Sequence, residues 1–560
     1  MRTSDTADLW WKTAVIYCLD VQTFLDWNGD GCGDFAGVTE RIDYLAELGV
    51  TCLWLMPFYP TADRDDGYAI TDFYGVDSRL GTHGDLVELI RTARDRGMRV
   101  IVDLVVNHTS DRHPWFKAAR SSKDSPYRDF YVWRSEPPEQ DTSDQVVFPD
   151  QEDSIWELDE RTGEYYLHQF YKHQPDLNIA NPRVRDEIAK MMGFWLELGI
   201  SGFRVDAVPF YLGLTGVAPK EAADFADPHD YLAALRSFLG RRTGDGILLG
   251  EVNLPYAEQK KFFGGRDGDE LTMMFDFVGM QNMYLALARQ DARPLVRTLK
   301  RRPDVSPDSQ WVSFARNHDE LTLDKLSESE RQEVFAAFGP DPQMQIFGRG
   351  LRRRLPPMLA GDPRRIRMTY SLMFAMPGTP ALFYGEEIGM GENLDIDGRL
   401  AVRTPMQWTD GRNGGFSTAR PARLPRPVVD GAFGPEHVNV ADQRSDRDSL
   451  LSFLTLLVRR YRECPELGWS DVNLLDQPHR GVIAHESRWQ ERRLVTVHNL
   501  SPEPCTVPLR LEDCEPDCRL VDLLQDGSTE LGDDGSVELT LDGYGYRWLR
   551  LLPAESRTLA

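Results

Sequence analysis

The sequence predicts an α/β protein: a (β/α)8 TIM barrel with an inserted subdomain after its third strand and a C-terminal antiparallel β-sandwich domain. Short apolar runs alternate with amphipathic helical stretches from about Ala14 to Tyr384, which is the order expected of a parallel barrel. Acidic residues directly follow several of these runs, where a barrel keeps its functional groups. After Arg462 the pattern changes to alternating strands, which favours a separate antiparallel domain.

Apolar runs with the length of buried strands lie at residues 14–17, 52–56, 100–106, 201–205, 246–250, 273–277, 311–315 and 381–384. Helical stretches lie between most of them, at residues 37–48, 84–96, 182–198, 228–241, 294–300 and 364–376. Because parallel strands need long crossover connections, this alternation predicts the barrel. Further runs predict the strands of the C-terminal domain, at residues 482–485, 494–498, 505–509, 537–541 and 546–551.

Three stretches interrupt the alternation and are predicted to overhang the mouth of the barrel. After Val106 about 75 residues pass before the next clear helix, at Pro182, and this length predicts a small inserted domain. The other two stretches, residues 324–363 and 392–427, follow late strands. We therefore expect the barrel in residues 1–108 and 177–462, the inserted domain in residues 109–176 and the C-terminal β domain in residues 463–560.

The composition is that of an ordinary soluble globular protein, with 41% hydrophobic and 27% charged residues. A formal net charge of −25 would repel phosphate backbones, so nucleic acid is not an expected partner. No apolar run is long enough to predict a membrane span, and the N-terminal segment lacks the pattern of a secretory signal. The scattered cysteines favour reduced thiols and a cytoplasmic location, and the oligomeric state stays open between a monomer and a homo-oligomer.

Three acidic residues close short apolar or glycine-bounded segments, and they are the main functional signal in the chain. Residues 202–206 end at Asp206, residues 248–251 end at Glu251, and residues 314–319 end at Asp319. A fourth segment, residues 101–108, has the same build but ends in Asn107 and His108. Carboxyl groups that converge at the carboxyl ends of barrel strands are typical of sites that cleave glycosidic bonds.

The neighbours of these acids indicate distinct roles. Arg204 and Asp206 are two positions apart on a strand, so they point to the same side, and the arginine is expected to keep the carboxylate ionised as a nucleophile. Glu251 has apolar neighbours, which would raise its pKa and let it donate a proton at neutral pH. Taken alone, Arg204 and Asp206 are better explained as an ordinary ion pair. The conjunction of three strand-end acids in one barrel favours the catalytic interpretation.

These segments resemble the signatures of the α-amylase superfamily of glycoside hydrolases and transglycosylases. Residues 103–108 (DLVVNH), 202–208 (GFRVDAV), 250–253 (GEVN) and 314–319 (FARNHD) resemble its strand-end signatures. Residues 66–68 (DGY), 174–178 (QPDLN) and 403–408 (RTPMQW) resemble its terminal-sugar element, its fifth signature and a segment of its oligosaccharide-active branch. The resemblance covers nearly the whole chain, with the motifs in the expected order.

The resemblance implies a role for each matched residue. Asp206 would be the nucleophile that forms a covalent β-glucosyl enzyme, Glu251 the acid and base, and Asp319 the residue that holds the ring hydroxyls at C2 and C3. The implied pocket for the non-reducing glucose is lined by Asp66, Tyr68, His108, Phe170, Gln174, Arg204, His318 and Arg403. Packing at the barrel rim is the alternative role of these lining residues.

A glycine-rich loop at residues 26–34 (DWNGDGCGD) has oxygen-bearing groups at alternate positions, as EF-hand-like calcium loops do. The expected ligands of calcium, with magnesium as the alternative ion, are Asp26, Asn28, Asp30, the carbonyl of Cys32 and Asp34. An unliganded glycine turn is the alternative interpretation. The resemblance implies a second calcium site at Asn107 and Asp176, near a stretch (FYLG, residues 210–213) where the related trehalose synthases have Tyr-Leu-Tyr-Glu.

Several segments are most similar to the trehalose synthases, a branch of the family that interconverts maltose and trehalose. They are residues 55–60 (LMPFYP), 316–322 (RNHDELT) and 350–355 (GLRRRL). The resemblance implies an isomerase that keeps freed glucose in a closed pocket and acts on a small α-glucoside. Departures at residues 18–21 (CLDV) and 252–255 (VNLP) leave open an α-glucosidase or α-glucosyltransferase acting on small α-1,4-linked oligosaccharides. A non-enzymatic binding relative is the third alternative, but such relatives usually lack the catalytic acids.

Overall fold

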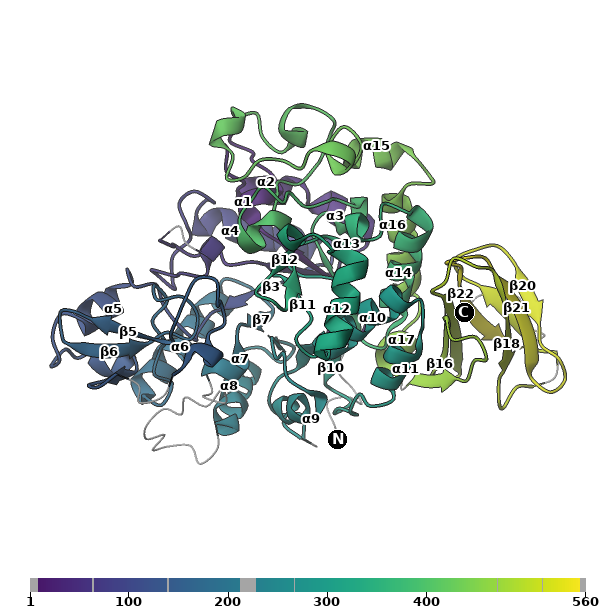
Figure 1. Ribbon diagram of the computed structural model, residues 1–560, viewed down its shortest axis with the longest axis horizontal. Helices are drawn as coiled ribbons and strands as arrows, with labels where there is room; N and C mark the ends of the chain where they lie inside the picture. The colour runs from purple at the N-terminus through teal and green to yellow at the C-terminus, as the bar shows by residue number, and fades with distance from the viewer. Residues whose placement is uncertain are drawn as a thin grey trace.

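The computed structural model describes residues 9–62, 65–137, 141–211, 228–265, 267–470, 472–515 and 517–553. At its centre eight strands close into a barrel in the order β1-β14-β10-β9-β8-β7-β3-β2 (Figure 1). Neighbouring strands are parallel all the way round, which confirms the predicted TIM barrel. The strands are β1 Ile16–Leu19, β2 Cys52–Leu55, β3 Arg99–Leu104, β7 Gly202–Val205, β8 Ile247–Gly250, β9 Met273–Phe275, β10 Gln310–Phe314 and β14 Thr379–Phe383.

Helices surround the barrel, and local capping residues set where several of them begin. Thr82 and Asp85 form a capping box at the start of α4, and Asn181 caps α6 in front of Pro182. The helix predicted over residues 37–48 is divided at Arg41. The helices around the barrel include α2 Phe35–Glu40, α3 Ile42–Leu48, α4 His83–Asp95, α6 Pro182–Glu197, α8 His229–Arg242, α10 Phe277–Arg289, α11 Arg293–Leu299, α14 Pro363–Ala375 and α16 Leu450–Arg462.

The segment after β3 forms a small sheet at the flank of the barrel, on the side opposite the C-terminal domain (Figure 1). Strands β4 Trp133–Arg134, β5 Trp156–Asp159 and β6 Glu164–Leu167 pair antiparallel in the order β4-β6-β5. Helix α5 Pro114–Ala119 packs on the sheet through Phe116, whose ring centroid is 5.1 Å from that of Tyr166. A bridge between His108 and Asp176 joins the two ends of this segment beside the barrel.

The segments after β10 and β14 are built from short elements. Strands β11 Leu321–Thr322, β12 Gln345–Ile346 and β13 Gly350–Leu351 form an antiparallel sheet, and α12 Glu328–Phe338 lies between the first two. After β14 the chain makes 3-10 turns, η9 Gly398–Val402, η10 Arg412–Gly415 and η11 Pro421–Arg423. Short elements connected by irregular backbone explain why no regular pattern marks these segments in the sequence.

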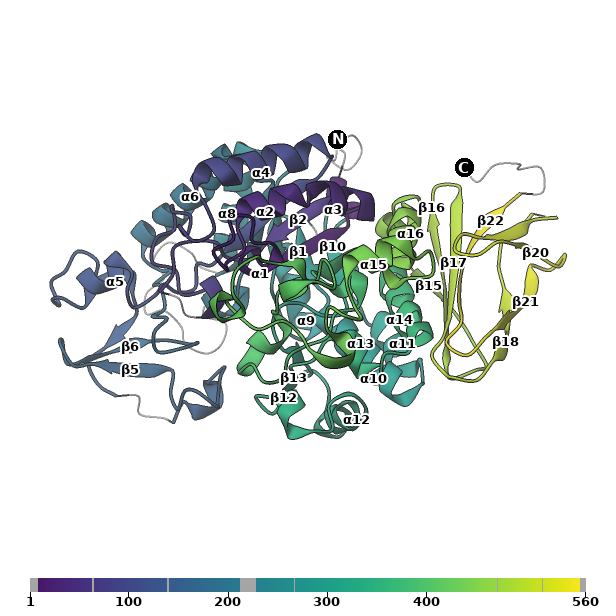
Figure 2. The same ribbon diagram turned by 90° about the horizontal axis from the view of Figure 1, so that it is seen from above.

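The C-terminal domain is a sandwich of a six-stranded and a two-stranded antiparallel sheet, seen on the right in Figures 1 and 2. The larger sheet has the order β15 Val472–Leu475, β16 Val482–Trp489, β17 Arg492–Asn499, β22 Tyr546–Leu552, β19 Arg519–Asp522 and β20 Ser528–Glu530. The smaller sheet pairs β18 Cys505–Arg510 with β21 Ser536–Leu541. The domain contacts the barrel where the indole of Trp548 and the ring of His498 each lie 3.0 Å from the Ser371 hydroxyl of α14.

None of the helices in the described part of the chain has the length and apolar character that a membrane crossing requires. Residues 1–8 and 554–560, at the outer ends of the predicted domains, lie outside the described residues. Gly213, which stands where the trehalose synthases have a glutamate, lies outside them too.

Candidate active site

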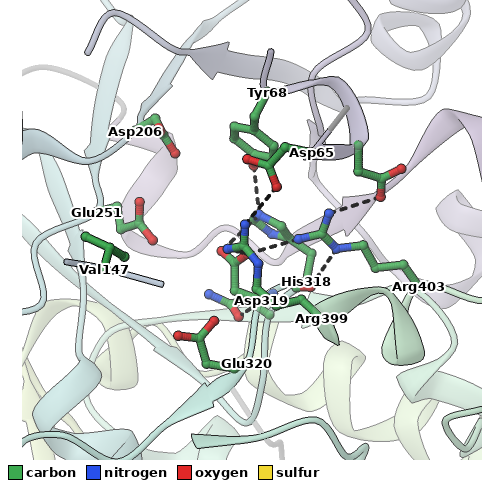
Figure 3. A network of polar contacts seen from close by, with 12 residues as sticks. Asp65, Tyr68, Val147, Asp206, Glu251, His318, Asp319, Glu320, Arg399 and Arg403 are labelled. Atoms are coloured by element: carbon green, nitrogen blue, oxygen red, sulfur yellow. Dashed lines mark hydrogen bonds and ion pairs between the residues drawn. The ribbon is translucent and has the colours of Figure 1, made fainter. Parts of the chain in front are cut away.

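The predicted catalytic carboxyl groups lie in segments that follow three barrel strands. Strand β7 ends at Val205, so Asp206 is the first residue beyond it, and Glu251 is the first residue beyond β8. The N–H of Glu251 donates to the carbonyl of Val205 at 3.0 Å, which continues the ladder between these strands. Asp319 lies in the loop after β10, where its N–H donates to the side chain of Asn317 at 3.0 Å. Figure 3 shows the three carboxyl groups around one space.

The buried guanidinium of Arg204 connects these groups. Its Nη1 donates to Asp206 and, at 2.6 Å, to Oδ1 of Asp103, while its Nη2 lies 2.9 Å from Oε2 of Glu251. The indole of Trp54 donates to the other oxygen of Asp103 at 2.6 Å and so fixes that carboxyl group. Arg204 therefore offsets the charge of three buried acids and orients them.

Burial determines the protonation of Asp206 and Glu251. It raises the pKa of Asp206 to about 6, although the contact with Arg204 opposes the shift. It also raises the pKa of Glu251 to about 7, again against the effect of Arg204. The predicted apolar setting of Glu251 was therefore incomplete, because an arginine contacts it directly. Near neutral pH this pair can hold one carboxylate and one carboxylic acid, as a nucleophile and a general acid require.

Asp319 is surrounded by donors that favour its ionised form. Its Oδ1 accepts from Arg399 and from Nη2 of Arg403 at 2.9 Å, and its Oδ2 lies 3.2 Å from Nε2 of His318. Burial opposes ionisation, but Arg399, His318 and Arg403 together lower the pKa of Asp319 far below its ordinary value. Asp319 is thus a fixed carboxylate, suited to accept hydrogen bonds from hydroxyl groups.

The residues predicted to bind the terminal sugar form a connected polar cluster. Nη1 of Arg403 lies 3.0 Å from Oδ2 of Asp66, and its Nε donates to the carbonyl of His318 at 2.8 Å. The hydroxyl of Tyr68 is 2.7 Å from Nε2 of His318, and His108 lies 3.2 Å from the Tyr68 carbonyl. Burial lowers the pKa of His108 to about 4, so this ring is neutral at physiological pH. The structure brings all five residues together.

Phe170 and Gln174 lie in different surroundings. Phe170 borders the cavity described below, and its ring centroid is 5.4 Å from that of His108 and 4.9 Å from that of Phe210. Gln174 is fully buried and donates to Oδ2 of Asp65 at 2.9 Å. Gln174 therefore supports a neighbouring acid, whereas its predicted position was in the lining of the sugar pocket.

A cavity of about 410 Å³ opens beside the catalytic carboxyl groups. Its lining includes Glu251 and Asp319 from the barrel, Phe170 from the inserted domain, and Lys325 and Arg399 from the later segments. All three predicted overhanging stretches therefore contribute to one cavity. Its volume lies within the range of small-ligand pockets, and its mixed polar and aromatic lining suits a sugar.

Several residues at this site are absent from the set that the sequence predicts. Asp65 and Asp103 stand inside or beside matched motifs, so their position was available as a signal. Arg399 precedes the matched RTPMQW segment by a few residues. Phe148 and Arg426 lie in irregular segments with no pattern, and only the fold shows that Phe148 borders the cavity and that Arg426 contacts Asp66.

The predicted calcium loop is a compact turn in front of α2. Asp26 accepts from the N–H of Gly31 at 2.8 Å, Asp30 accepts from that of Cys32 at 2.8 Å, and Asp34 caps the helix. Its oxygen donors fit calcium chemically. Within the described residues no three His, Cys, Asp or Glu side chains are grouped as a metal site.

Asn107 and Asp176, predicted as the second calcium site, are in contact. Nδ2 of Asn107 donates to Oδ1 of Asp176 at 3.1 Å. The side chain of Gln169 donates to Oδ2 of Asp176 at 2.8 Å. Burial raises the pKa of Asp176 to about 8. Among the described residues Oδ1 of Asn107 has no hydrogen-bond partner although it is buried. A buried acid and an unused amide oxygen are donors that fit a cation.

Family models match most of the chain. A model described as the α-amylase catalytic domain matches residues 19–335 and 353–467, and a model of the sucrose hydrolase-like C-terminal domain matches residues 492–550. A (β/α)8 barrel with buried carboxyl groups at its strand ends is typical of glycoside-active barrel enzymes. Within that class, the chain belongs to the α-amylase family.

Individual relatives cover nearly the full length. The trehalose synthase/amylase of Mycolicibacterium smegmatis is 39% identical, over 98% of this chain and 94% of that protein. The trehalose synthase of Thermus thermophilus is 41% identical over 98% of this chain, which spans only 56% of that longer protein. Among solved structures, the trehalulose synthase MutB of Pseudomonas mesoacidophila is similar with a TM-score of 0.76 at 28% identity, over 97% of this chain and 99% of that one.

Proposed function

We propose that this protein interconverts maltose and trehalose through a covalent glucosyl enzyme. The observation that carries the proposal is that Asp206 and Glu251 are buried together and both contact Arg204. Burial raises the pKa of Asp206 to about 6 and that of Glu251 to about 7. A nucleophile and an acid with separated pKa values suit a two-step displacement. Relatives named trehalose synthase, 37–41% identical over 97–98% of the chain, support the choice of substrates.

In the proposed first step, a carboxylate oxygen of Asp206 attacks the anomeric carbon of the non-reducing glucose. The bond from that carbon to the glycosidic oxygen breaks, and Glu251 gives its proton to the leaving oxygen. Asp319 accepts hydrogen bonds from the ring hydroxyls at C2 and C3, which strengthen as positive charge develops on the ring.

In the second step, the freed glucose turns within the pocket until its own anomeric hydroxyl faces the glucosyl group. Glu251 removes the proton of that hydroxyl, the α-1,1 bond forms, and the bond to Asp206 breaks. Two displacements at one carbon retain its α configuration.

This sequence of steps requires that water be kept out while the glucose turns. Contacts across the mouth support that requirement. Nη2 of Arg349, beside β13, donates to the carbonyl of Val147 in the inserted domain at 2.8 Å. The ring of Phe347 lies 5.2 Å from that of Phe148. The inserted domain and the segment after β10 therefore touch above the cavity, which favours transfer to the retained glucose over transfer to water.

An α-glucosidase or α-glucosyltransferase is the second candidate. It is favoured by relatives such as the glucan 1,6-α-glucosidase of Streptococcus pneumoniae, 34% identical over 88% of the chain. Incubation with maltose and analysis of the sugars tests both candidates. Trehalose as the main product supports the isomerase, whereas glucose as the only product would show that the second candidate is right.

Calcium binding and a cytoplasmic location are parts of the same proposal. Asp26, Asn28, Asp30, Asp34 and the carbonyl of Cys32 would hold a structural ion that stabilises the fold. All seven cysteines are free thiols, which is in keeping with a reducing compartment.

A further inference from the structure

Arg399 lies in one segment at the catalytic end of the barrel and contacts residues of three others. It lies in η9, after β14, and its Nη1 contacts Oδ1 of Asp319, after β10. Its Nη2 lies 2.9 Å from Oδ1 of Asp65, after β2. Its guanidinium carbon is 4.9 Å from the ring centroid of Phe148, in the inserted domain. Figure 3 shows the Arg399 side chain linked to both acids.

The contact with Asp319 competes with the sugar. The proposed mechanism gives this carboxylate to the hydroxyls at C2 and C3, yet Arg399 and Arg403 both contact its Oδ1. Oδ1 of Asp319 already accepts from both arginines, whereas Oδ2 has its contact with His318. When both ring hydroxyls bind this carboxylate, the hydroxyl that takes Oδ1 must therefore displace one donor.

The surroundings of the two arginines decide which one moves. Arg403 has a side chain only 1% exposed, held by Asp66 at 3.0 Å and by the carbonyl of His318 at 2.8 Å. The side chain of Arg399 is 14% exposed and borders the cavity. Its contacts with Asp65 and Phe148 do not depend on Asp319. Arg399 can therefore leave Asp319 and stay attached to the mouth.

We infer that Arg399 is a positioning residue that closes the sugar pocket: it occupies Asp319 before substrate binds, yields this carboxylate to the ring hydroxyls, and stays on Asp65 and Phe148 as a barrier to water. The inference rests on the proposed function, because a closed pocket matters only if the freed glucose must be retained. It goes beyond that function by naming the residue that couples sugar binding to closure.

The anchors of Arg399 are themselves fixed. Gln174 donates to Asp65 at 2.9 Å. The ring centroid of Phe148 lies 4.4 Å from that of Tyr171 and 5.2 Å from that of Phe347. The planar fork of an arginine can span two carboxylates, whereas one ammonium group cannot reproduce that geometry. Lysine at this position should therefore restore only part of the effect.

The test compares Arg399→Gln and Arg399→Lys with the wild type, and with Arg412→Gln, an exposed arginine of the same segment, as the matched control. With maltose as substrate, Arg399→Gln should raise the ratio of glucose to trehalose by about tenfold. Arg399→Lys should give an intermediate ratio, and Arg412→Gln should match the wild type. An unchanged ratio in a folded Arg399→Gln would overturn the inference.

Two further measurements keep the outcome decisive. If Arg399→Gln does not fold, Asp65→Asn removes the charged anchor and should shift the product ratio in the same direction; an unchanged ratio there would count against the inference.

The second measurement is the inhibition constant of glucose. Because no guanidinium needs displacing, Arg399→Gln should bind glucose at least as tightly as the wild type, and weaker binding would overturn the competition at Asp319. A wild type that makes no trehalose would refute the proposed function, and the inhibition constant would still test this competition.

Discussion

Nη2 of Arg204 lies 2.9 Å from Oε2 of Glu251, so the cation beside the proposed nucleophile also contacts the proposed acid. The same guanidinium donates to Asp206 through Nη1. Ionisation of either acid therefore changes the field at the other, and the two titrate as a pair. Burial raises both pKa values and this shared arginine opposes the rise, which leaves the site able to hold one carboxylate and one carboxylic acid near neutral pH.

Replacing Arg204 with glutamine should leave Asp206, Glu251 and Asp103 buried without their cation. The free energy of unfolding at neutral pH should fall by about 3–5 kcal/mol, as when one partner of a buried ion pair is removed. Without Arg204, these acids have higher pKa values in the folded state than in the unfolded state. The loss of unfolding free energy should therefore grow as pH rises and shrink as pH falls. Urea unfolding at acidic and alkaline pH measures this trend. Arg91→Gln, at an exposed ion pair, is the control, and a loss independent of pH would contradict the account.

The pH dependence of kcat/KM should be a narrow bell. Below a pKa of about 6, Asp206 is protonated and cannot attack; above a pKa of about 7, Glu251 has lost the proton it must give. The activity should therefore be highest between these values, with both limbs belonging to the coupled pair. Initial rates with maltose across the pH range give the profile. A rate that stays flat through pH 6 and 7 would show that these acids do not control the step.

Glu251→Gln should separate the acid from the nucleophile. Cleavage of maltose should fall by roughly a thousandfold, because its leaving oxygen needs a proton. A glucosyl fluoride needs no such proton, so glucosyl transfer to Asp206 should be much less affected. Asp206→Ala should abolish turnover of both substrates. Pre-steady-state release of fluoride measures the first step, and equal losses with both substrates in Glu251→Gln would remove Glu251 from the acid role.

Calcium should raise the melting temperature through the loop at residues 26–34. Binding to the folded state alone adds about 2.7 kcal/mol at a calcium concentration of about 100 times Kd. Asp30→Asn, which changes an exposed loop carboxylate, should remove most of that rise, whereas Asp410→Asn, at an exposed site elsewhere, should retain it. Thermal melting with calcium and with a chelator checks this. An identical shift in Asp30→Asn would place the ion elsewhere.

The barrel could be predicted because strands buried on both faces read as continuous apolar runs, as in Ile247–Gly250. Helix α10 could not be predicted in the same way. Phe277, Met280 and Tyr284 are buried among other buried residues of this helix, so it lacks the polar face on which an amphipathic pattern depends. The strand predicted over residues 273–277 therefore extends into the start of the helix.

The candidate site was predictable as far as its residues belong to contiguous motifs. Asp206 and Glu251 are marked by the strands that they follow. Arg399 carries no such mark, because its partners Asp319 and Asp65 lie 80 and 334 positions away along the chain. Contacts between loops of different strands depend on closure of the barrel, which local sequence patterns do not encode.

The most direct test of the account is the fate of the glucose freed from maltose. Unlabelled maltose should be incubated with the enzyme and an excess of ¹³C-labelled free glucose, and the trehalose analysed by mass spectrometry. The account predicts trehalose as the main product with almost no label, because the freed glucose turns and rejoins without leaving the pocket. Glucose as the only product, or trehalose that carries the label, would contradict it.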